Sequence, residues 1–92
     1  MRVLWLLRAV DDLERIHDFI ARDSRSAALA ETEKVLVAVK RLGDYPALGR
    51  PGRVPDTREL VVSSYVVAYR VRAGAVQVLR VLHGARRWPE RL

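Results

Sequence analysis

The sequence predicts an α+β fold, in which two N-terminal helices pack on one face of a small, mainly antiparallel four-stranded sheet. Two observations lead to this prediction. A strand-like start is followed by two amphipathic segments, and a loop rich in glycine and proline separates these from three strand-like runs, giving the order β-α-α-β-β-β. A chain of 92 residues has room for only one modest core. We therefore expect residues 1–92 to form a single domain.

The N-terminal half contains a short strand and two helices. Met1 to Leu7 is apolar, branched and aromatic, as is typical of a strand. From Ala9 to Arg22 apolar residues recur every three or four positions, which predicts an amphipathic helix. A short polar break then offers N-caps for a second helix from Ser26 to Leu42, which Gly43 ends. A connection of about three residues predicts an antiparallel helical hairpin.

The C-terminal half contains a loop and three strands. The loop from Gly43 to Asp56 is long for so small a domain, and loops of this length are usually functional or mobile. Strands are predicted at Thr57–Val62, Tyr65–Arg72 and Ala75–Leu82, with a tight turn before the last. Simple alternation along the last strand puts Gln77, Leu79, Val81 and His83 on one face, and Val76, Val78, Arg80 and Leu82 on the other.

The charge of the chain is strongly positive. Fifteen arginines and two lysines give a net charge of +6. Arginine binds phosphates and carboxylates bidentately, so the excess suits a nucleic acid or an acidic protein partner. The alternative is that codon bias in a GC-rich genome has turned surface lysines into arginines. Charge alone leaves both explanations open.

Several classes of site are excluded by composition. The chain has no cysteine and its two histidines are far apart, so we expect no disulfide, no metal site and a cytoplasmic location. Neither a Walker-type phosphate loop nor a nucleophile elbow is present, and we expect no cofactor. The apolar run at the N-terminus is too short for a signal peptide or a membrane span.

A basic cluster is the best candidate site in the sequence. If the three C-terminal strands are neighbours, their basic residues can meet at the edge of the sheet and bind a phosphodiester. His83 could then act as general acid or base, with Glu59 as the nearest carboxylate, although a histidine at a strand end is more often structural. Trp88 is either a stacking platform or, as we favour, a packing residue. The members of the expected cluster are Arg58, Arg80, His83, Arg86 and Arg87.

Four blocks of sequence, in this order, resemble the RelE/ParE superfamily of type II toxins, and most closely its RelE/StbE branch. They read A-x-DDLERIHDFIA, where x is Val10, then LGRPGRVPDTREL, YVVAYRV and LRVLHGARRWP, and they cover essentially the whole chain. The resemblance implies a cognate antitoxin that wraps and silences the toxin, within a larger toxin-antitoxin complex. It also implies one of two targets. RelE-like toxins cut mRNA in the ribosomal A site, whereas ParE-like toxins inhibit DNA gyrase and have no nuclease activity.

The resemblance also suggests roles for single residues. Arg58 and Arg86 match positions where RelE-like enzymes place basic residues that hold the scissile phosphate, and His83 and Glu59 resemble an acid/base pair used by some members. The nucleic acid or protein target would then be contacted by Arg50, Arg53, Arg80 and Arg87. Two departures stand out, because Val66 replaces an expected basic residue and the C-terminal catalytic tyrosine is missing. We expect an mRNA interferase, with a gyrase inhibitor or an inactive relic as the alternatives.

Overall fold

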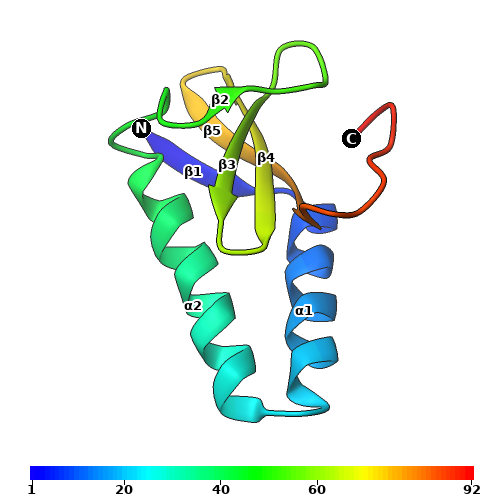
Figure 1. The fold of residues 1–92 in the computed structure, drawn as a ribbon. Helices are drawn as coiled ribbons and strands as arrows, with labels where there is room; N and C mark the ends of the chain where they lie inside the picture. The colour runs from blue at the N-terminus through cyan, green and yellow to red at the C-terminus, as the bar shows by residue number, and fades with distance from the viewer.

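Two helices form one layer of the molecule and five strands form the other (Figure 1). The computed structural model describes residues 1–92. Along the chain the elements are β1 (Arg2–Trp5), α1 (Leu7–Ala21), α2 (Arg25–Arg41), β2 (Arg50–Pro51), β3 (Arg58–Val62), β4 (Tyr65–Arg72) and β5 (Ala75–His83). The predicted α+β class and the helix-then-strand order are confirmed.

The helices form the expected hairpin, and their ends lie within two residues of the predicted ones. Ser24 caps α2, since its side-chain oxygen accepts a hydrogen bond of 3.1 Å from the backbone N–H of Ala27. Lys40 and Arg41 occupy the last turn of α2, where positive charge interacts favourably with the helix dipole. Neither α1 nor α2 is long and apolar enough to cross a lipid bilayer.

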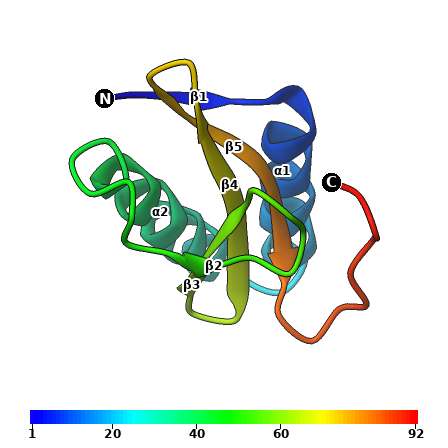
Figure 2. The same ribbon diagram turned by 90° about the horizontal axis from the view of Figure 1, so that it is seen from above.

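The sheet has the strand order β1-β5-β4-β3-β2. β3, β4 and β5 form an antiparallel meander, and β1 lies parallel to β5 at one edge (Figure 2). The fifth strand, β2, was not predicted. It consists of Arg50 and Pro51 paired with Arg58 and Glu59 of β3. A two-residue strand that contains a proline is too short to produce an alternating pattern, and proline is tolerated there because β2 is an edge strand.

The hydrophobic core fills the space between the two layers. Small and branched residues dominate it, which allows the helices to approach the sheet closely. Trp5, Leu13 and Ile16 pack around its margin. The buried members of this cluster are Ala9 from α1, Val35 and Val39 from α2, and Val62, Val67, Val78 and Val81 from the sheet.

A β-bulge in β5 changes which residues face the core. Ala68 pairs with Arg80, but the next residue of β4, Tyr69, pairs with Val78, so Leu79 has no partner. One extra residue in a strand reverses the alternation beyond it. Val78 and Val81 consequently both enter the core, and the predicted faces of the last strand, which separated these two residues, are wrong.

The long loop before β3 is fixed to the core by one side chain. Tyr69 is fully buried, and its hydroxyl accepts a hydrogen bond from the Gly49 N–H (2.8 Å) and donates one to the Pro46 carbonyl (2.7 Å). A Cβ atom at Gly49 would lie 2.7 Å from the tyrosine ring, so only glycine fits there. The loop is therefore an ordered cover over one end of the sheet.

Candidate functional site

The register of the sheet divides the predicted site residues into separate groups. Arg58 pairs with Tyr69 of β4, whereas His83 pairs with Tyr65 of the same strand. Four residues along a strand correspond to about 13 Å, and Arg58 and His83 also lie on different strands. The prediction that the basic residues of these strands meet in one cluster is therefore wrong.

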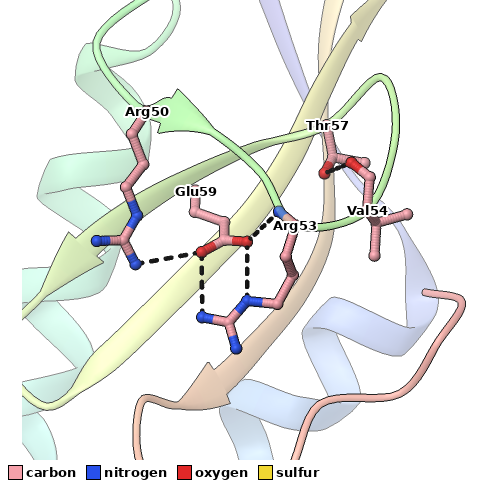
Figure 3. A network of polar contacts seen from close by, with 5 residues as sticks. All are labelled: Arg50, Arg53, Val54, Thr57 and Glu59. Atoms are coloured by element: carbon pink, nitrogen blue, oxygen red, sulfur yellow. Dashed lines mark hydrogen bonds and ion pairs between the residues drawn. The ribbon is translucent and has the colours of Figure 1, made fainter.

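Glu59 is the buried centre of an ionic network whose two arginines are partly exposed (Figure 3). Its side chain is only 3% exposed. The Arg53 guanidinium donates to both carboxylate oxygens, at 3.2 and 3.3 Å, and the Arg53 backbone N–H donates at 2.8 Å. Arg50 donates a further bond of 3.2 Å. The network joins the loop to the sheet.

The surroundings of Glu59 also determine its acidity. Burial acts to raise the pKa of the carboxyl, but the hydrogen bonds from Arg53 and Arg50 outweigh it, and the pKa lies below its ordinary value. A carboxylate held in this way is a weak base, and its oxygens are already occupied.

Arg58 is held by the loop as well. Its guanidinium donates to the backbone carbonyls of Gly49, at 2.7 Å, and Ala47, at 3.4 Å. The residue lies at the start of β3, next to the short strand β2. In this structure Arg58 ties the loop down, and its side chain is half-buried.

Arg80 is buried in an ion pair with α1. Its guanidinium contacts both carboxylate oxygens of Asp12, at 2.7 and 3.0 Å, and Asp12 also accepts the Val81 backbone N–H at 3.0 Å. Hydrogen bonding to Asp12 raises the pKa of Arg80 despite its burial. Sequence reasoning missed Asp12, although its spacing from Ala9 and Ile16 puts it on the buried face of α1. Arg80 is consequently inaccessible to a target.

His83 and Arg86 do lie together. They line a groove of about 290 Å³ between α1 and the end of β5, together with Phe19 and Tyr65. The His83 ring meets the Tyr65 ring edge-on, with 5.5 Å between their centres. The backbone N–H of Ala85 donates to Nδ1 of His83 at 3.1 Å, so the proton of a neutral imidazole is on Nε2. Burial, followed by the nearby charge of Glu31, raises the pKa of Tyr65.

The segment after β5 turns back along the molecule beside α1 (Figures 1 and 2). The Arg53 guanidinium carbon lies 3.9 Å from the centre of the Trp88 ring, a cation–π contact. Trp88 is thus a packing residue, as expected, and Arg87 beside it is exposed. No three histidine, aspartate or glutamate side chains lie close enough together to hold a metal ion.

A comparison with models of protein families identifies the family of this chain. Residues 3–88 match the family described as the ParE toxin of the type II toxin-antitoxin system, parDE. The chain belongs to the ParE toxin family. It is accordingly the toxin component of a type II toxin-antitoxin system, and its partner is an antitoxin protein. The superfamily expected from the four sequence blocks is confirmed.

Individual relatives of this ParE-family toxin agree with the assignment. It is 40% identical over 91 residues to the putative toxin Y4kP of Sinorhizobium fredii, covering 97% of this chain and 94% of the relative. It is 35% identical over 85 residues to toxin RelE2 of Caulobacter vibrioides, covering 92% and 97%. A solved chain of the chromosomal ParDE system from P. aeruginosa has a TM-score of 0.80 at 27% identity, covering 90% of this chain and 95% of that one.

Proposed function

We propose that this toxin arrests growth by binding DNA gyrase and does not cut mRNA. One observation carries the proposal, namely that the four residues which the RelE resemblance assigns to catalysis fall into two groups at different ends of the sheet. Arg58 and Glu59 are engaged by the loop, while His83 and Arg86 line the groove beside α1. A nuclease needs its phosphate-binding and proton-transferring groups around one scissile bond.

The chemistry of Glu59 supports the same proposal. A general base acts best when its pKa is near the working pH, and the pKa of Glu59 lies below that of a free carboxylate. Two arginines would have to leave the carboxylate before it could accept a proton from a substrate. The match to a ParE family model and the likeness to a ParDE chain support this proposal, whereas the relative named toxin RelE2 supports the second candidate.

Ribosome-dependent mRNA cleavage remains the second candidate, because His83 and Arg86 share a groove. The free Nε2–H of His83 is a hydrogen-bond donor, and Arg86 is an exposed cation with no carboxylate partner. In this candidate Arg86 would stabilise the charge on a scissile phosphate and His83 would protonate the leaving group.

Induction of the toxin without its antitoxin separates the two candidates. We expect growth arrest with induction of the DNA-damage response, inhibited supercoiling by purified gyrase and uncut mRNA. Growth arrest with cut mRNA that disappears in His83→Ala and Arg86→Ala would replace this proposal by the nuclease. A chain that bound its antitoxin without stopping growth would be an inactive relic, and would contradict both candidates.

A further inference from the structure

A groove rich in arginine lies apart from the groove of His83 and Arg86. It has a volume of about 480 Å³ and runs between the start of α1, the Val54–Thr57 part of the loop and the last residues of the chain. Leu79, the unpaired residue of the β5 bulge, contributes to its lining. We call it the arginine groove, and its charged residues are Arg8, Arg70, Arg72, Arg91 and Asp56.

Positive charge exceeds negative charge in the arginine groove, although Arg8 donates a hydrogen bond to an oxygen of Leu92 and Arg70 donates one to Gln77. None of its four arginines forms an ion pair with a side-chain carboxylate, and Asp56 is the one acidic side chain in the lining. Arg72 and Arg91 are exposed, and their side chains make no hydrogen bond within the chain. A smaller adjoining groove shares Asp56 and Arg70 and adds Arg58. Two guanidinium groups without partners, beside two more arginines that have no side-chain carboxylate partner, attract an anion.

The backbone of β4 spaces two of these cations regularly. Arg70 and Arg72 are two residues apart on one strand, so they share a face and their Cα atoms are about 7 Å apart. This spacing is close to that of successive phosphates along a nucleic-acid strand. Both positions are held by pairing with β5, through Gln77 and Ala75.

The lining also indicates which nucleic acid fits. Single-stranded nucleic acids are bound by stacking their bases on aromatic side chains, and no aromatic residue lines the arginine groove. Binding through guanidinium groups alone is typical of contacts to a duplex backbone. We propose that the arginine groove binds the phosphodiester backbone of duplex DNA. This site is separate from the groove of His83 and Arg86, and the inference does not depend on gyrase being the target.

The test uses the purified full-length toxin and a labelled 20-base-pair DNA duplex. Affinity is measured by fluorescence anisotropy over a series of salt concentrations. Arg72 and Arg91 are replaced together by glutamine. The slope of log affinity against log salt concentration should then become shallower by about 2, since each lost phosphate contact removes about 1 from the slope. The matched control is Arg25→Gln with Arg41→Gln, which removes the same charge from exposed positions on α2.

Three results would overturn the proposal. The first is an unchanged slope in the groove variant, and the second is an equal loss of slope in the control. The third is that single-stranded DNA or a polyglutamate peptide binds more tightly than the duplex at equal ionic strength, with the same dependence on the groove arginines. If the first variant does not fold, Arg8→Gln with Arg72→Gln gives the same comparison. Failure here would leave the gyrase test unaffected, because that test measures supercoiling and DNA damage.

Discussion

At the scale of single residues, the contact between Asp12 and Arg80 joins parts of the chain that are 68 positions apart. Both side chains are 9% exposed, and two nitrogens of the guanidinium contact the two oxygens of the carboxylate. The Asp12 carboxylate also satisfies the Val81 N–H, at a part of β5 that β1 does not reach. One carboxylate thus positions α1 on the sheet and completes the hydrogen bonding of β5.

Removing the Asp12 side chain should therefore destabilise the folded protein strongly. Asp12→Ala leaves a buried guanidinium and a buried N–H without partners, and we expect the free energy of unfolding to fall by about 3–5 kcal/mol. Urea denaturation followed by circular dichroism measures the change. Asp11→Ala is the matched control, because the Asp11 side chain is 55% exposed and its ion pair with Arg15 lies at the surface. That variant should lose less than about 1 kcal/mol. Equal losses would contradict the buried role of Asp12.

Glu59 should make stability depend on pH. Its pKa is lower in the folded protein than in the unfolded chain, so the ionised carboxylate stabilises the fold above the unfolded pKa of about 4.3. This stabilisation is lost as the pH falls through the folded pKa. We expect Glu59→Gln to be less stable than the wild type at pH 7, and the difference to shrink toward pH 3. Urea unfolding at several pH values tests this, and a difference that grew on acidification would disprove it.

At the scale of elements, the loop between α2 and β3 and the segment after β5 support each other. Arg53 links them, since it binds Glu59 on one side and the Trp88 ring on the other. The indole N–H of Trp88 is buried without an acceptor, which makes the tryptophan costlier to bury than a phenylalanine.

Mutation can separate the effect of the Trp88 ring on stability from the effect of its indole N–H. Trp88→Ala removes the ring from Arg53, and we expect a loss of about 1–2 kcal/mol. Trp88→Phe keeps a ring over the guanidinium and removes the unpaired N–H, so its stability should equal or exceed that of the wild type. Thermal unfolding of both variants measures this. If phenylalanine were as damaging as alanine, the stacking contact would not be the stabilising one.

Much of this arrangement follows from local sequence, and the remainder depends on contacts between distant residues. The helices were predictable because apolar residues recur at helical spacing, and β4 because a tight turn follows it. The bulge at Leu79 was not predictable, because apolar residues occur in both phases of β5 and its sequence fits either alternation. For the candidate site, the link between His83 and Arg86 is local, whereas the partners of Glu59 and Arg80 become clear only when distant segments meet.

At the scale of the whole molecule, the net charge of +6 should govern how fast the toxin meets its antitoxin. We expect the antitoxin to present acidic residues to the arginines, so the association rate should fall steeply as salt is raised, while the dissociation rate changes little. Stopped-flow fluorescence at several ionic strengths measures both rates. An association rate independent of salt would rule out electrostatic steering.

The strand order limits how much strand edge the free protein exposes to other copies of itself. The longest strands, β4 and β5, lie inside the sheet, and the outer positions belong to β1, with four residues, and β2, with two. Long unpaired strand edges are templates on which other chains add and aggregate. Asp12 satisfies the Val81 N–H in the part of β5 that β1 leaves uncovered. When released from its antitoxin, the toxin therefore offers only short stretches of strand edge for another copy to extend.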